Sequence, residues 1–137
     1  MQKTTALLLI DLQNDYFPGG KMELVGAGEA GRRSAAVLQG FRARHMPVMH
    51  IAHESVRQGA TFFLSGTAGQ RIHDLVQPGE EEMVVTKHFP NSFLKTPLLD
   101  MLRRLEVTHL VIAGMMTDMC VDATVRAATD LGFACTL

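Results

Sequence analysis

Five apolar runs limit how this chain can fold, and the first of them, from Thr5 to Ile10, is the clearest. It shows no alternation of apolar and polar residues, which is typical of a strand buried on both faces of a parallel sheet. Apolar residues at helical spacing separate most of the later runs, which lie at 47–52, 83–86, 109–113 and 133–137. Strands that alternate with helices predict a doubly wound, Rossmann-like α/β/α sandwich with a mainly parallel sheet. We expect the first strand to be central.

The length of the chain predicts a single domain over residues 1–137. A domain of 137 residues can bury a sizeable core, and no linker or internal repeat divides the sequence. The last apolar run ends at Leu137 with no polar turn after it. We therefore expect the domain to be truncated at its C-terminus.

The composition limits the partners and the compartment. Thirteen basic residues against fourteen acidic ones give a net charge of −1 without a basic stripe, which argues against nucleic acid and membrane surfaces as partners. No N-terminal apolar run is long enough for a membrane span or a signal core, and two cysteines outside a CxxC pair make no disulfide framework. We expect a cytoplasmic protein that acts on a small molecule. Because 47% of the residues are apolar, we also expect a second copy to cover an exposed sheet edge, giving a homo-oligomer, a dimer or larger.

A glycine-rich segment from Gly26 to Gly31 fits the GxGxxG pattern of dinucleotide-binding loops. In a dinucleotide-binding domain this loop directly follows the first buried strand. Here the first strand ends at Ile10, and only the short segment 22–25 precedes the glycines. We interpret them as a loop and a helix start, and we expect no cofactor.

Two histidines on the second strand raise the question of a metal site. His50 and His53 are three residues apart, so their side chains face opposite sides of a sheet and cannot share one ion without a bulge. We therefore predict no metal ion. His53 remains a candidate for lining a pocket at the strand end.

Three reactive side chains stand where three of the predicted strands end. Asp11 follows the first strand, Lys87 the third, and Cys120 the fourth. Each has a simpler explanation by itself, as a turn cap, a solvated charge or a core residue. In an open α/β sheet, however, ligands bind in the crevice outside the carboxyl ends of the strands. The coincidence of all three favours one shared site.

The chemistry of a cysteine nucleophile would use all three groups. A thiol is mostly protonated at neutral pH, and an ammonium or a helix N-terminus stabilises the thiolate. A carboxylate can carry the thiol proton and return it to a leaving amine, and free N–H groups near Thr117 or Asp118 can hold an oxyanion. By contrast, Cys135 lies within an apolar run, so we expect it to be buried and inert.

Three segments resemble the isochorismatase-like cysteine hydrolases, namely LIDLQND at 9–15, TKH at 86–88 and GMMTDMCV at 114–121. The resemblance implies the doubly wound fold and a catalytic triad of Asp11, Lys87 and Cys120. It also implies a non-proline cis peptide at Met115–Met116, with the Met116 and Cys120 N–H groups as the oxyanion hole. Chains of this family continue with another strand and helix, which we expect to be missing here.

Together, the residues and the resemblance predict a metal-independent hydrolase of a small amide or related carbonyl compound, acting through a thioester. The presence of Cys120 favours acyl chemistry over isochorismate-type vinyl-ether hydrolysis, and the Asp-x-His metal motif of nicotinamidases does not occur at 50–55, HIAHES. Vinyl-ether hydrolysis and a binding module without turnover remain the alternatives, since a fold does not fix a function. Gln13 and Asn14 are expected to position the loop that carries Asp11. The candidates for the substrate pocket are Gln13, Phe17, His53, Phe62, Phe89 and Phe93.

Overall fold

A five-stranded parallel sheet forms the centre of the molecule. The structure, a computed structural model, describes residues 3–137. The strands lie in the order β3-β2-β1-β4-β5, and every neighbouring pair is parallel. The first strand is therefore central, as predicted. The strands are β1 (Thr4–Ile10), β2 (Val48–His53), β3 (Met83–Lys87), β4 (Val107–Gly114) and β5 (Ala134–Thr136).

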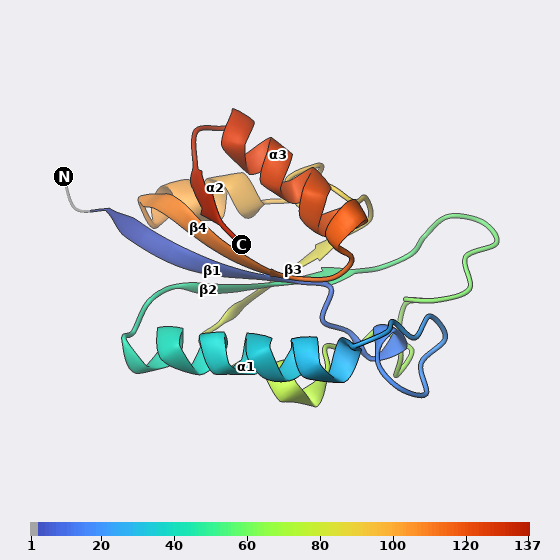
Figure 1. Cartoon of the computed structure of the whole chain (residues 1–137). Helices are drawn as coiled ribbons and strands as arrows, with labels where there is room; N and C mark the ends of the chain where they lie inside the picture. Colours follow the sequence, from blue (N-terminus) through green and yellow to red (C-terminus); the bar gives the residue numbers. More distant parts are fainter. Residues whose placement is uncertain (1–2) are drawn as a thin grey trace.

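Helices cover both faces of this sheet and complete the predicted α/β/α sandwich. Helix α1 (Ala27–Ala43) lies on one face, whereas α2 (Leu98–Arg104) and α3 (Asp122–Asp130) lie on the other (Figure 1). Short helical turns η1 (Asn14–Tyr16), η2 (Asp74–Val76) and η3 (Thr117–Val121) supplement them. Within residues 3–137, no helix has the length and apolar character that crossing a membrane requires.

The unbroken apolar run of β1 is explained by the two cores on either side of the sheet. Leu7 and Leu9 belong to the cluster that includes Leu38 of α1. Leu8 points the other way and belongs to the cluster with Leu102 of α2. Because successive side chains of a strand face opposite sides, a strand between two helical layers needs apolar residues at every position.

The start of helix α2 differs from the sequence prediction, and the start of helix α1 agrees with it. Apolar spacing predicts a helix from Leu94, but α2 begins at Leu98, because the residue before Pro97 is disfavoured in a helical conformation. Gly26 has a φ of 76° and forms the N-cap of α1. The glycine-rich segment thus starts a helix, as interpreted from the sequence.

Candidate active site

Three buried side chains meet at the carboxyl edge of the sheet. The Lys87 Nζ atom lies 3.2 Å from Oδ2 of Asp11 and 3.2 Å from Sγ of Cys120. Asp11 and Lys87 have no exposure to solvent, and Cys120 is 6% exposed. The structure thus joins the three strand-end residues that the sequence singles out.

The ends of β1 and β4 hold Asp11 beside the segment that carries Cys120. Asp11 has a φ of 55°, which turns the chain away from the sheet, while its N–H still donates to the Ile51 carbonyl at 2.9 Å. Next to it, the Met115 N–H donates to the Ile10 carbonyl at 3.0 Å. Gly114 has a φ of 147°, and a Cβ there would collide with the same Ile10 carbonyl. A glycine is therefore needed where the two strands come this close.

Cys120 lies in the π-helical turn η3, which continues into α3. The Met116 carbonyl accepts the N–H groups of Met119 and Val121, at 3.1 and 3.2 Å, and closes this turn. The Met115–Met116 peptide bond is cis, as the resemblance implies. Cys120 lies between these two donors in the first turn of the helix, where backbone N–H groups commonly lack an acceptor within the helix.

The charges of the site are strongly coupled. Burial raises the pKa of the Cys120 thiol to about 12; the Asp11 carboxylate adds to this effect and the Lys87 ammonium opposes it. Burial also raises the pKa of Asp11, again opposed by Lys87. One buried cation thus faces one negative charge, which Asp11 and Cys120 can share as a coupled unit.

One oxygen of Asp11 is available for a proton. Its Oδ1 atom is buried and receives no hydrogen bond from residues 3–137, whereas Oδ2 faces Lys87. A carboxylate oxygen of Asp11 and the Sγ atom of Cys120 lie within 4.8 Å of each other. A carboxylate with a free lone pair at this distance can accept the thiol proton after a small adjustment.

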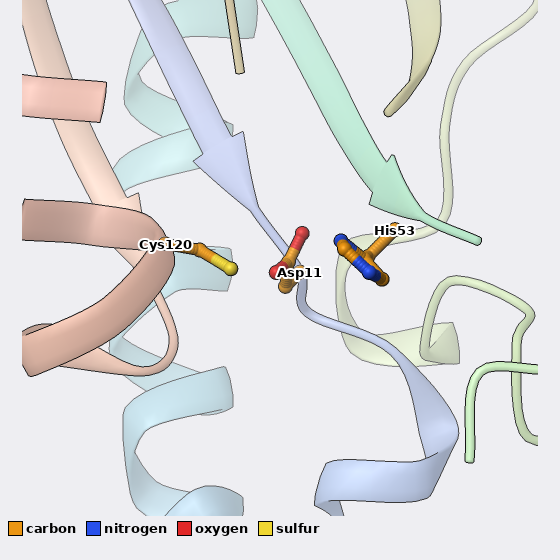
Figure 2. Close-up of side chains that lie close together, drawn as sticks. All are labelled: Asp11, His53 and Cys120. Carbon is orange, nitrogen blue, oxygen red and sulfur yellow. The ribbon is translucent and has the colours of Figure 1, made fainter. Parts of the chain in front are cut away.

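His53 completes the cluster from the end of β2. Figure 2 shows Asp11 between Cys120 and His53, and the Nδ1 atom of His53 lies 2.8 Å from Lys87 Nζ. Carboxylate, imidazole and thiolate are donors that zinc accepts. Here the Lys87 ammonium is within hydrogen-bonding distance of all three, so it already supplies the positive charge. His50 does not join them, because its Nε2 atom lies 2.8 Å from Oε1 of Glu82.

Two of the six pocket candidates are connected to the cluster of Asp11, Lys87 and Cys120. His53 contacts Lys87 directly, and Gln13 contacts His53. Gln13 is fully buried, and its amide nitrogen donates to the carbonyl groups of His53 and Gln70. Gln13 therefore supports the backbone next to the site and has no surface that a substrate could contact.

The four phenylalanine candidates have different surroundings. Phe17 is in the core beneath α1, where it stacks on His73 at 3.9 Å between ring centroids, and its 2% exposure leaves it no open surface. Phe93 packs on Phe133 beside the cluster that contains Cys120. Phe62 is half-buried, and Phe89 is exposed under the ammonium of Lys95.

Sequence reasoning missed two aromatic residues near the site. Tyr16 packs edge-on against Phe63, at 4.6 Å between ring centroids, and both are buried. Burial raises the pKa of Tyr16, and the negative charges of Asp11 and Cys120 raise it further. Tyr16 could have been found, because it follows the Asp11 motif directly. Phe63 belongs to a loop without any periodic signal.

Cys135 differs from the sequence expectation. It lies on β5, at the edge of the described sheet, and is partly exposed rather than buried. The apolar run predicts a covered strand, but in residues 3–137 the sheet has no further strand beyond β5. Of the two free thiols, Cys120 is the more buried.

The arrangement defines an α/β protein with a buried carboxylate, ammonium and thiol at the carboxyl edge of a parallel sheet. The isochorismatase domain matches this sequence over residues 5–137. The chain therefore belongs to the isochorismatase family and is a hydrolase of that family.

Relatives and solved structures agree with this assignment. The isochorismatase family protein YddQ of Bacillus subtilis is 48% identical over 132 residues, which are 96% of this chain and 73% of that protein. A crystal structure of an Oleispira antarctica protein of the same family, also 48% identical, superimposes with a TM-score of 0.93 over 98% of this chain and 73% of the other. The ureidoacrylate amidohydrolase RutB of Caulobacter vibrioides is 28% identical over 159 residues, covering 90% of this chain and 70% of RutB.

Proposed function

We propose that the protein hydrolyses a small amide, or a related carbonyl compound with a C–N bond, through a thioester on Cys120. The observation that carries the proposal is the buried contact of one ammonium with both a carboxylate and a thiol. This arrangement lets a proton move between sulfur and oxygen without any change in the total charge of the site. The similarity to an amidohydrolase supports an amide as the substrate class.

Activation of the nucleophile is the first step. The thiol proton moves from Cys120 to Asp11, whose buried Oδ1 atom has no other donor from residues 3–137. The resulting thiolate stays 3.2 Å from the Lys87 ammonium, which stabilises it. The charge thus moves from oxygen to sulfur while Lys87 remains its counterion.

Attack of the thiolate on the substrate carbonyl forms a carbon–sulfur bond and places a negative charge on the carbonyl oxygen. The N–H groups of Met116 and Cys120 are the proposed donors to this oxyanion. The protonated Asp11 gives its proton to the leaving nitrogen, and the C–N bond breaks. Ammonia or an amine departs and leaves the acyl group on sulfur.

Hydrolysis of the thioester restores the site. A water molecule attacks the acyl carbon as the Asp11 carboxylate takes one of its protons. The carbon–sulfur bond then breaks, and Asp11 returns this proton to sulfur as the carboxylic acid leaves. One water is consumed for each amide bond, and the charges of Asp11, Lys87 and Cys120 are those of the starting state.

A panel of small carboxamides and ureido compounds, assayed for ammonia release, tests the proposal. We expect turnover with at least one member, loss of turnover in Cys120→Ala, and normal turnover in the matched Cys135→Ala variant. Hydrolysis of isochorismate without ammonia release from any amide would instead favour vinyl-ether chemistry. Ammonia release that persists in Cys120→Ala would contradict the role of the thiol.

A further inference from the structure

The Lys87 ammonium has three N–H groups and finds three acceptors in its buried surroundings. Besides Asp11 and Cys120, each at 3.2 Å, the third acceptor is Nδ1 of His53, which at 2.8 Å is the shortest of the three contacts. Lys87 is fully buried, so water cannot replace a missing partner. An unpaired N–H on a buried cation is costly, and the third contact therefore bears on where the ammonium points.

The position of His53 beside Lys87 follows from the register of the sheet. His53 and Lys87 are paired residues at the ends of the parallel strands β2 and β3. Paired residues of neighbouring strands project on the same face, so the imidazole and the ammonium lie side by side. The Glu54 N–H donates to the Lys87 carbonyl at 2.9 Å and extends the pairing past this point.

A side-chain amide fixes the backbone of His53 where a neighbouring strand is lost. After Asp11, β1 turns away, and within residues 3–137 the His53 peptide has no main-chain partner on that side. The Gln13 side chain takes over, because its Oε1 accepts the His53 N–H at 2.9 Å and its Nε2 donates to the His53 carbonyl at 2.8 Å. This two-point contact sets the angle at which the imidazole meets Lys87.

The contact with an ammonium also fixes the protonation of the imidazole. Lys87 has only donors, so Nδ1 of His53 must be an acceptor and the ring proton is on Nε2. The groups that face this ring agree with a neutral imidazole. Burial and then the charges of Lys87, His88 and Arg57 lower the pKa of His53 to about 4. At neutral pH the ring is therefore uncharged.

We infer that His53 is a positioning residue: its neutral Nδ1 atom holds the third N–H of Lys87, so that the other two point at Asp11 and Cys120. Gln13 serves the same end by fixing the His53 peptide. The effect of His53 on turnover rests on the proposed function, but the effect of His53 on the reactivity of the Cys120 thiol does not. His53 thus acts through Lys87 rather than as a metal ligand or a substrate contact.

Alkylation of Cys120 by iodoacetamide, followed by peptide mass mapping, tests this inference without a substrate. His53→Leu removes the acceptor, and we expect the alkylation rate at pH 7 to fall by roughly tenfold or more, the usual effect of losing a hydrogen bond to a charged group. His53→Asn should keep the rate within about threefold, because its Oδ1 atom replaces Nδ1 as an acceptor of a hydrogen bond. His45→Asn is the matched control, since His45 is exposed with a φ of 54° that asparagine tolerates.

Nitrogen-15 NMR of the histidine rings in the unmodified protein gives a second, independent measurement. We expect the His53 signals, assigned by their loss in His53→Asn, to show an unprotonated Nδ1 and a protonated Nε2 at pH 7. A protonated Nδ1, or an alkylation rate in His53→Leu equal to that of the His45→Asn control, would overturn the inference. So would a His53→Asn variant as slow as His53→Leu, because this would assign the role to Nε2. Failure of the ammonia assay alone would contradict only the proposed function.

Discussion

The ammonium of Lys87 lies 3.2 Å from the carboxylate of Asp11, and neither side chain has any exposure to solvent. Such a pair contributes little net stability compared with apolar residues, but removal of one partner leaves an uncompensated charge in the interior. The pair is therefore sensitive to single substitutions and tolerant of paired ones. This sensitivity gives a first test of the geometry that needs no substrate.

Lys87→Met should lower the free energy of unfolding by roughly 3–5 kcal/mol, because Asp11 loses its counterion. The double variant Asp11→Asn/Lys87→Met should recover much of this loss, since no charge is then left unpaired. Urea unfolding measures both effects. Lys21→Met, at an exposed lysine, is the control and should change stability by no more than about 0.5 kcal/mol. Equal stability of the Lys87 and Lys21 variants would contradict a buried pair.

Asp11→Asn should separate the reactivity of the thiol from turnover. The negative charge of Asp11 helps to raise the pKa of Cys120, whereas Lys87 lowers it. Without the carboxylate, Lys87 alone faces the sulfur, so the pKa of the thiol falls and a larger fraction is thiolate at pH 7. Alkylation of Cys120 should accelerate, while hydrolysis should stop for lack of a proton carrier.

The more exposed thiol of Cys135 provides the internal standard for this experiment. The ratio of the two alkylation rates, measured in one sample by mass mapping, should increase in Asp11→Asn and decrease in Lys87→Met. A decrease in Asp11→Asn would mean that the carboxylate supports the thiolate, contrary to the charge balance described above.

The sequence was sufficient to predict which strand ends would meet. An apolar run followed by Asp11, and a second followed by Lys87, are local signals, and parallel topology brings their carboxyl ends to one edge. The contact between His53 and Lys87 was not predictable in this way, because it requires the register of β2 on β3 and a strand that extends to both residues. The boundaries of short strands are set by tertiary pairing rather than by local pattern.

Long loops and sheet edges limited the remaining predictions. The two-point contact of Gln13 with His53 arises because β1 turns away at Asp11. No pattern of residues in the sequence predicts this change in the backbone. Phe63 lies in a loop without any periodic pattern, where its own N–H donates to Oδ2 of Asp15 at 2.7 Å. The exposure of Cys135 depends on what lies beside β5, and an apolar run carries no information about its neighbours.

The stability of the protein should depend on pH through His53. Its pKa is lowered to about 4 in the folded protein from an ordinary value of 6.5. Between these values the unfolded chain binds more protons, so stability is fully present above pH 6.5 and falls as the pH is lowered toward 4. Between pH 7 and pH 5 this effect amounts to about 2 kcal/mol.

Urea unfolding at the two pH values measures this dependence. His53→Asn should lose that part of it, whereas His45→Asn should retain it. His50, whose pKa burial also lowers, contributes with the same sign in all three proteins and cancels from the comparison. An unchanged pH dependence in His53→Asn would mean that His53 is not a buried neutral base.

Metal binding should appear only when Lys87 is removed. Turnover of the unmodified protein should survive exhaustive chelation, because the ammonium already fills the space between Asp11, His53 and Cys120. In Lys87→Ala these three donors, within 4.8 Å of one another, should bind Co²⁺ and give a thiolate-to-metal absorption band. The band should be absent in Lys87→Ala/Cys120→Ala. Activity of the unmodified protein that is lost with chelator and restored by a metal ion would contradict this account.

The acyl group on Cys120 is the intermediate that the whole account requires, and it can be detected directly. The measurement is peptide mass mapping after acid quenching of the protein during turnover of an amide identified by ammonia release. We predict that the peptide containing Cys120 gains the mass of the acyl group, that the peptide containing Cys135 does not, and that hydroxylamine removes the added mass. Turnover at the full rate with Cys120 unmodified at every time point, together with retained activity in Cys120→Ala, would contradict a thioester mechanism.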